Sequence, residues 1–339
     1  MVKRGRVRAH GVAGVVALSL IAAACGGGDG DGAADGVKGT VKVSGSSTVE
    51  PISALVAELF NEDNPDVNIT VAGPGTGDGF ELFCNGQIDI ADASRAIEPE
   101  EETACADGGV SHQELEVAFD GITVMVNAAS PIECLTLADL YAIFGPESEG
   151  VASTAEANAL STEVGGAGNL PEQPLEITAP GEESGTYDAF IELSGIEDTA
   201  IENGLSEDAA AALRPDYQSS ANDNVIVQAM EGSPNAIGFA GFAFAEEAGD
   251  AVKEVGIDAG DGCVAASAET IADGSYPLSR SLYIYPNVDT AESDAAVKAF
   301  VDFYLTEEGL SLAVEEAGYI PLPADRMEQT RSAWESAAS

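Results

Sequence analysis

Three short segments rich in hydroxyl groups and glycine share one layout, in which a strand leads into a loop and the loop into a helix. They are SGSSTVEP (44–51), GPGTGDGF (73–80) and ESGTYDAF (183–190). Each can place Ser or Thr hydroxyls and free backbone N–H groups at a helix start, an arrangement that favours anions. For any one such loop, an ordinary helix cap is the better interpretation, because Ser and Thr are common N-cap residues. Three in one chain favour a shared anion-binding cleft.

The same residues give little support for catalysis. The two histidines are His10, near the start of the chain, and His112, in the polar segment GGVSHQEL, which we interpret as a surface residue. One histidine cannot form an HExxH zinc site, and nothing marks a partner for a Ser-His-Asp triad. No Cys/His spacing indicates a metal site. We therefore predict no catalytic residue, no metal, no cofactor and no enzymatic activity.

Two arginines stand out because the chain has only 13 Lys+Arg against 59 Asp+Glu. Arg95 follows a predicted strand in DIADASRAI, at the sheet edge where parallel strands present loops to ligands. A surface salt bridge is the alternative for Arg95. Arg280, in PLSRSLYIY, is expected to tie two parts of the fold together, or to pair with an acid at a hinge, rather than to touch a ligand.

Strand and helix patterns alternate from residue 39, which predicts parallel βαβ units and an α/β fold. In PISALVAELFNEDN, Pro51 suits a first helical turn, and the apolar residues from Ile52 to Phe60 recur at helical spacing. The expected strands are 39–45, 66–73, 88–94, 175–180 and 236–244. The expected helices are 51–64, 79–87, 135–145, 222–235 and about 292–317, with a terminal helix around Trp334 packed on the first lobe. Residues 146–170 are interpreted as a surface excursion.

Two long strand-like segments, 117–127 and 276–286, could connect two α/β lobes and leave a ligand cleft between them. A single continuous α/β domain is the alternative. The two-lobed interpretation assigns residues 38–119 plus 276–339 to the first lobe and 120–275 to the second.

The N-terminus has the layout of an export signal. A basic start precedes GVAGVVALSLIAAA, which is too short for a membrane span of about 20 residues but suits a signal peptide. LIAAAC resembles a bacterial lipobox whose cysteine, Cys25, receives a lipid, although Ala22 stands where leucine is usual. A plain secretory signal is the alternative. We predict a signal peptide at 1–24, a flexible Gly/Asp tether at 25–37, and an exported protein that is anchored to the outer face of the cell membrane or periplasmic.

The mature chain is strongly acidic. Without the four bases of the first ten residues, 9 Lys+Arg face 59 Asp+Glu, a net charge near −50. This excludes electrostatic docking on nucleic acid or anionic lipid as a main function. Solubility in a salty medium explains the charge better than an acidic binding surface does.

Four cysteines remain after Cys25, and an even number in an exported chain predicts two disulfides with three possible connectivities. We favour Cys84–Cys105 with Cys134–Cys263. Both would be structural staples.

Six segments together resemble the phosphate-binding proteins of bacterial phosphate ABC transporters, the PstS-like group. The resemblance covers about residues 40–320 and implies a type II periplasmic-binding-protein fold, with two lobes joined by crossover strands. It also implies an exported receptor that closes on one phosphate and delivers it to a membrane permease. The segments are VSGSSTVEPI, GPGTGDGFELFCNGQIDIADASRAI, AFDGITVMVN, APGEESGTYDAF, NDNVIVQAM and PLSRSLYIYPN.

The resemblance also implies ligand contacts from all three loops. Pro180 occupies the place of a family arginine, and Ser94 and Arg95 stand where the family has an acid, so we infer that Arg95 supplies the cationic contact. A carboxylate that accepts the proton of phosphate would select against sulfate. Asp120 is our candidate for this acceptor and Asp78 the second. The expected contacts from the loops are Ser47, Thr48, the N–H near Val49, Thr76, Gly77, Ser184, Gly185 and Thr186.

These observations favour a monomeric phosphate receptor whose partners are inorganic phosphate and the ABC permease subunits, with no nucleic acid. The same fold could instead bind another oxyanion such as sulfate or molybdate. From other classes, the chain could be an exported phosphoester hydrolase with Ser184 as nucleophile, or a surface sensor or adhesion protein.

Overall fold

The computed structural model describes residues 36–182 and 184–339, and within this range strands and helices alternate along the chain. The predicted signal peptide, Cys25 and most of the tether lie outside the described residues. No helix in the described range is long and apolar enough to cross a membrane. Residues 36–339 form one compact unit.

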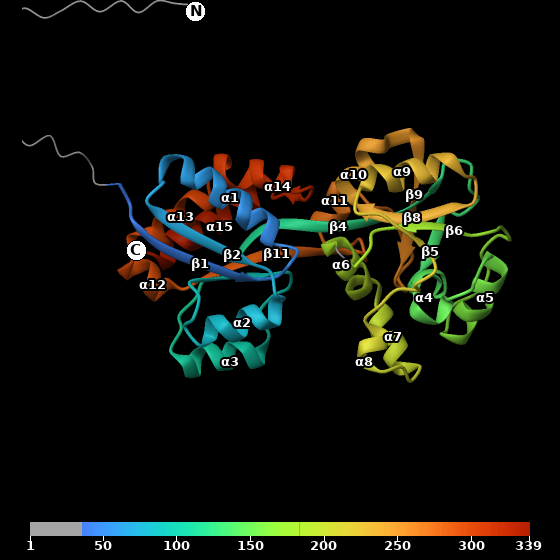
Figure 1. Ribbon diagram of the computed structural model, residues 1–339, viewed down its shortest axis with the longest axis horizontal. Helices are drawn as coiled ribbons and strands as arrows, with labels where there is room; N and C mark the ends of the chain where they lie inside the picture. The colour runs from blue at the N-terminus through green and yellow to red at the C-terminus, as the bar shows by residue number, and fades with distance from the viewer. Residues whose placement is uncertain (1–35, 183) are drawn as a thin grey trace, which may run out of the picture. The chain divides into compact units, whose positions relative to one another are not determined.

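The first sheet has the strand order β2-β1-β3-β11-β4 (Figure 1). β1 runs parallel to β2 and β3, as the βαβ pattern predicts, whereas β11 lies antiparallel between β3 and β4. Short β12 pairs with β4 on its other side. The strands are β1 (Gly39–Gly45), β2 (Val67–Ala72), β3 (Ile90–Ala93), β4 (Leu115–Asn127), β11 (Ser279–Pro286) and β12 (Ile320–Pro321).

The second sheet continues from the same long strand. The end of β4, from Ile122 to Asn127, pairs antiparallel with β8 and β9, and β6 pairs parallel with β8. Figure 1 shows β4 leaving the first sheet and entering the second. The segment predicted to be strand-like at 117–127 is a strand, and it pairs in both sheets. The further strands are β5 (Cys134–Thr136), β6 (Glu176–Ala179), β7 (Gln218–Ser219), β8 (Ala236–Gly241), β9 (Val252–Asp258) and β10 (Cys263–Val264).

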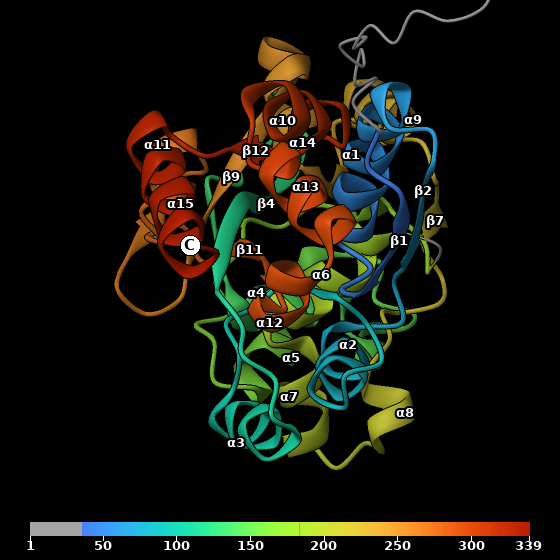
Figure 2. The same cartoon turned by 90° about the vertical axis from the view of Figure 1, so that its left-hand side faces the viewer.

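Helices cover both faces of the first sheet. Figures 1 and 2 show α1 and α13 on one side of β1, and α2 and α3 on the other. α15 packs on β4, which confirms the terminal helix around Trp334. The bounds are α1 (Glu50–Asp63), α2 (Thr76–Cys84), α3 (Pro99–Gly108), α12 (Val288–Ser293), α13 (Ala295–Tyr304), η3 (Glu307–Ser311), α14 (Leu312–Glu316) and α15 (Ala324–Ala337).

The single helix predicted at about 292–317 is wrong, because the chain breaks twice there. The Asp294 carboxylate accepts the backbone N–H of Ala296 and starts α13 anew. The Thr306 hydroxyl accepts the N–H of Gly309 and starts the next turn. Both caps replace helical hydrogen bonds with side-chain ones.

The second sheet carries a set of shorter helices. The surface excursion predicted at 146–170 contains α5, whose Ala157 and Ser161 are fully buried, so this segment contributes to the packing. The Ser161 hydroxyl donates to Asp139 at 2.7 Å. The bounds are α4 (Leu137–Phe144), η1 (Pro146–Ser148), α5 (Thr154–Glu163), α6 (Gly185–Ser194), α7 (Ile196–Glu202), α8 (Glu207–Ala210), α9 (Asp223–Gly232), α10 (Phe242–Ala248), η2 (Gly249–Ala251) and α11 (Ala268–Ala272).

Two disulfides fasten the outer elements, with the pairing that we favoured. Cys84–Cys105 joins α2 to α3, and Cys134–Cys263 joins β5 to β10. The first lies in a small apolar cluster between α2, α3 and the sheet, with Phe80, Phe83 and Tyr285. It therefore holds the helix that begins with the second hydroxyl-rich loop.

Candidate functional site

A cavity of about 370 Å³ lies where the ends of β1 and β3 meet the starts of α1 and α2. The first and second hydroxyl-rich loops form most of its wall. The third loop contributes through α6, the helix that follows it. The lining residues are Ser46, Ser47, Thr48, Gly73, Pro74, Gly75, Thr76, Gly77, Ser94, Arg95, Asp188, Glu192 and Arg280.

The first loop is braced by its own hydrogen bonds. The Ser46 hydroxyl accepts the backbone N–H groups of Thr48 and Val49, at 3.2 and 3.4 Å. The Ser46 N–H donates to the Asp92 carbonyl on β3 at 2.8 Å. Val49 is fully buried at the start of α1, so its side chain anchors the loop while its N–H bonds within it.

Two glycines let the second loop pack directly on the end of β1. Gly45 has φ 148°, and a Cβ there would lie 2.0 Å from the Asp92 carbonyl oxygen. A Cβ on Gly79 would lie 2.5 Å from the Gly45 Cα. This close approach, which only glycine allows, brings Thr76 to Ser94. Their hydroxyl oxygens are 3.1 Å apart.

The third loop lies against the first loop, next to the cavity. The Ser184 hydroxyl caps α6 by accepting the Thr186 N–H at 3.2 Å. A Cβ on Gly185 would lie 3.8 Å from the Ser47 carbonyl oxygen. Of the described residues that line the cavity, none comes from 184–186, so the predicted contacts of the third loop lie beside it.

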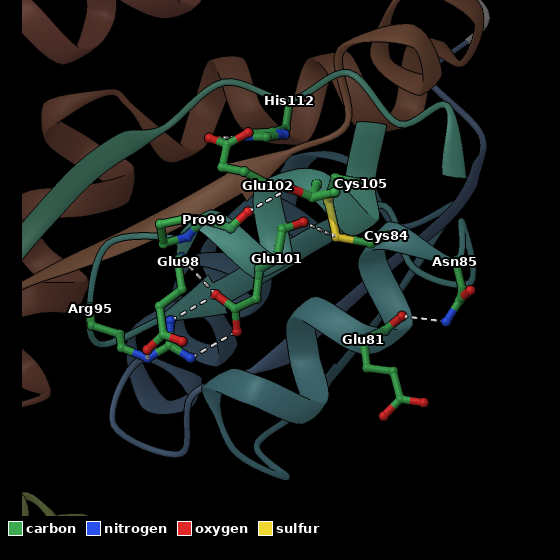
Figure 3. The surroundings of a disulfide bond; sticks show 11 residues. Glu81, Cys84, Asn85, Arg95, Glu98, Pro99, Glu101, Glu102, Cys105 and His112 are labelled. Carbon is green, nitrogen blue, oxygen red and sulfur yellow. Dashed lines mark hydrogen bonds and ion pairs between the residues drawn. A yellow bond between two sulfur atoms is a disulfide. The ribbon is translucent and has the colours of Figure 1, made fainter. Parts of the chain in front are cut away.

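Arg95 lines the cavity and also forms an ion pair, so both interpretations of this residue describe part of its surroundings (Figure 3). Its Nη1 and Nη2 each donate at 2.8 Å to the carboxylate of Glu101 on α3. Its Nε is 3.3 Å from Glu98. The hydrogen bond with Glu101 raises the pKa of the Arg95 guanidinium above its ordinary value.

Arg280 is one of the cavity residues that sequence reasoning missed. Its expected ion pairs are present, with Asp120 on the neighbouring strand β4 and with Glu192 on α6. It also lines the cavity and donates to the Thr48 hydroxyl at 3.0 Å. The antiparallel register of β11 against β4, which places Arg280 opposite Asp120, carried no local signal in the sequence.

The carboxylates that line the cavity are not the ones that we expected to accept the proton of phosphate. Asp120 is buried beside Arg280, and the residues that line the cavity include neither Asp120 nor Asp78. Burial raises the pKa of Asp120, and the Arg280 charge opposes this rise without cancelling it. The carboxylates on the cavity wall belong to Asp188 and Glu192, one helical turn apart on α6.

A further acid, Asp92, lies fully buried beneath the first loop. Its Oδ1 accepts the Ser53 hydroxyl at 3.0 Å, and Ser53 is also 3.0 Å from the Tyr304 hydroxyl. Its Oδ2 has no hydrogen-bond partner among the described residues. Burial, the largest cause, raises the pKa of Asp92 to about 8.

The surface interpretation of His112 is wrong. Its side chain is 13% exposed and packs against the rings of Phe83 and Tyr285. Figure 3 shows His112 beside Glu102 of α3. Its Nε2 lies 3.4 Å from Glu102. The described residues contain no group of His, Cys, Asp and Glu side chains suited to a metal ion.

Comparison with known proteins identifies the fold family. Residues 32–308 match the model of the PBP superfamily domain. The chain is 40% identical to protein SphX of Synechococcus elongatus over 287 residues, which is 84% of this chain and 78% of SphX. It is 34% identical to the phosphate-binding protein PstS of Staphylococcus aureus over 308 residues, 90% of this chain and 85% of that protein.

Solved structures of similar fold include proteins described as phosphate-binding. The crystal structure of a possible phosphate binding protein from Planctomyces limnophilus superposes with a TM-score of 0.79 at 35% identity, covering 89% of this chain and all of that one. An ABC-type phosphate transport receptor from Vibrio cholerae shares the fold, with a TM-score of 0.58 at 24% identity over 84% of this chain and all of that one. The chain therefore belongs to the PBP superfamily and, within it, to the PstS-like family of phosphate-binding proteins, with the two-lobed α/β fold of that family.

Proposed function

We propose that this chain is an extracytoplasmic receptor that captures inorganic phosphate and delivers it to an ABC import permease, without catalysis. The observation that carries the proposal is the cavity in which Ser47, Thr48, Thr76 and Ser94 meet two arginines. Hydroxyls, helix-start N–H groups and guanidinium groups are the donors that suit a phosphate group. The PstS relatives, whose names describe phosphate binding, support the same ligand.

The proposed contacts come from both sides of the cavity. Arg95 supplies a cationic contact from the first sheet. Gly185 lies in contact with the first loop at Ser47 and Thr48, so the third loop can reach a ligand that the first loop holds. Asp120 remains the proposed acceptor for the proton of phosphate, with Asp78 the second candidate. The proposed donors are Ser47, Thr48, the Val49 N–H, Thr76, Gly77, Ser94, Ser184, Gly185 and Thr186.

The anchoring proposal concerns the start of the chain. We infer that residues 1–24 are cleaved as a signal peptide, that Cys25 carries a lipid at the outer face of the membrane, and that the receptor works as a monomer. The lipobox-like LIAAAC and the Gly/Asp segment that follows it support this arrangement. Metabolic labelling with a fatty acid, compared between the parent and Cys25→Ser, tests it.

A calorimetric titration tests the phosphate proposal. Residues 36–339, which form one compact unit, are first stripped of bound anion and then titrated with phosphate and with sulfate. We expect one phosphate per chain and little response to sulfate. A folded, stripped sample that gives no heat with phosphate but binds sulfate or molybdate would contradict the proposal and favour a receptor for another oxyanion.

A further inference from the structure

Arg280 contacts three partners that differ in how exposed they are to solvent. Its side chain is 9% exposed, and its Nε lies 3.3 Å from Asp120, whose side chain is 7% exposed. Its Nη2 donates to the hydroxyl of Thr48, which is also buried. Its Nη1 donates at 2.5 Å to Glu192, whose side chain is 56% exposed. Two contacts are thus fixed inside the fold, and the third is made by a carboxylate at the surface.

This third partner reaches Arg280 from the far wall of the cavity. Arg280 belongs to β11 of the first sheet, whereas Glu192 is on α6, the helix that follows the Ser184 loop. Both line the cavity that holds the hydroxyls of the first two loops. A carboxylate and a phosphate offer a guanidinium the same kind of partner, a negatively charged oxygen that accepts an N–H.

Resting on the function proposed above, we infer that Glu192 competes with phosphate for Arg280. A phosphate oxygen replaces the Glu192 carboxylate at Nη1, while Asp120 and Thr48 keep the guanidinium in position. Glu192 can turn into solvent because more than half of its side chain is already exposed, whereas Asp120 cannot leave its buried place. The protein is then fully competent for phosphate only in the fraction of molecules whose Glu192 has released Arg280, which lowers the apparent affinity.

The charges reinforce this competition. Asp188 lies one turn before Glu192 on the same wall, so a phosphate that enters meets two carboxylates on α6. When Glu192 moves away from Arg280, its negative charge no longer lies next to the phosphate, and one N–H donor of Arg280 becomes available to the phosphate. Glu192 therefore sets the affinity of the receptor without itself binding phosphate.

The test compares Glu192→Gln with a control that removes the same charge elsewhere. Glu202→Gln is suitable because Glu202 is exposed at the end of α7 and lies outside the cavity. We expect Glu192→Gln to bind phosphate about three- to tenfold more tightly, the range of an exposed ion pair and its repulsion of the ligand. Glu202→Gln should stay within about twofold of the parent because screening weakens distant charges.

Rapid-mixing kinetics separate competition from a structural effect. If Glu192 blocks Arg280, its removal increases the competent fraction, and the gain appears in the association rate rather than in the dissociation rate. A parent and a Glu192→Gln variant that bind phosphate equally would overturn the inference while leaving the receptor function intact. An equal gain in Glu202→Gln would also overturn it, because the effect would then be one of general charge. If none of the three folded proteins binds phosphate, the proposed function fails and the inference falls with it.

Discussion

Three acids surround Arg280, and each has a different environment. Asp120 is buried in contact with the arginine, whereas Asp188 and Glu192 lie on the cavity wall. At neutral pH phosphate keeps a proton that sulfate lacks. A carboxylate that accepts this proton gains a hydrogen bond with phosphate and meets only repulsion with sulfate. Selectivity at this site therefore depends on which of the acids reaches the ligand.

Asp120→Asn tests the acceptor. We expect the variant to lose its preference for phosphate over sulfate by about ten- to a hundredfold, the worth of one charged hydrogen bond. Competitive titrations with the two anions measure the preference, and circular dichroism checks that the fold is kept. Asp188→Asn, which changes a carboxylate on the cavity wall at α6, is the matched control. Preserved selectivity in Asp120→Asn together with its loss in Asp188→Asn would assign the acceptor to α6.

Asp92 should make stability depend on pH in a defined direction. Burial raises the pKa of Asp92 to about 8, above its ordinary value of 3.8. The folded state then holds the proton more tightly, so the contribution of Asp92 is fully present below about pH 4 and falls as the pH rises towards 8. Asp92→Asn removes this loss. Its free energy of unfolding relative to the parent should rise by roughly 1.4 kcal/mol per pH unit within that window.

Urea unfolding at pH 5 and pH 7 measures this difference. Asp63→Asn, at an exposed acid at the end of α1, should follow the parent at both values. Parallel curves for the parent and Asp92→Asn would mean that Asp92 is already ionised in the folded protein at pH 5.

At the scale of the elements, the two disulfides close loops of very different length. The sequence separations are 21 residues for Cys84–Cys105 and 129 for Cys134–Cys263. In the chain-entropy model, removal of the short-loop disulfide costs about 3 kcal/mol of stability and removal of the long-loop one about 5 kcal/mol. We expect Cys134→Ala/Cys263→Ala to lose more stability than Cys84→Ala/Cys105→Ala in urea unfolding. The reverse order would show that packing around α2 and α3 outweighs the entropy of the unfolded chain.

How far the sequence predicts these elements depends on how local their causes are. The strand 39–45 and the helix 51–64 were predicted within one residue, because alternation and helical spacing act over a few residues. The breaks at Asp294 and Thr306 were missed because an acid or a threonine in a helical pattern resembles any surface residue. The hydroxyl loops were found by composition. The place of Arg280 at the cavity was not, since it follows from pairing between residues 160 positions apart.

At the scale of the whole molecule, the proposed receptor for an anion is itself strongly negative. With a formal net charge of −46, the chain repels phosphate at long range, and only donors at contact distance attract it. Salt screens the long-range field over about 10 Å at 0.1 M but affects contacts inside the cavity far less. The two effects should therefore respond differently to ionic strength.

We expect the association rate of phosphate to rise with salt. Between 20 and 500 mM NaCl the increase should be about threefold or more, opposite to the decrease seen when opposite charges steer association. Rapid mixing at several salt concentrations measures it, with potassium gluconate in place of NaCl as a check on chloride competition. A rate that falls in both salts would show that the two arginines dominate the field at the cavity mouth.

The position of β11 in the first sheet affects the order in which the two sheets can form during synthesis. Synthesis supplies β1, β2 and β3 early, yet β11 (Ser279–Pro286), which lies between β3 and β4, follows well after β4 (Leu115–Asn127) in the sequence. The strands β5 to β10, by contrast, follow β4 without interruption. The second sheet can therefore form while the first sheet still lacks β11 and has an unpaired edge at β3. Until β11 arrives, this unpaired edge is open to pairing with other molecules, which makes the incomplete chain prone to aggregation.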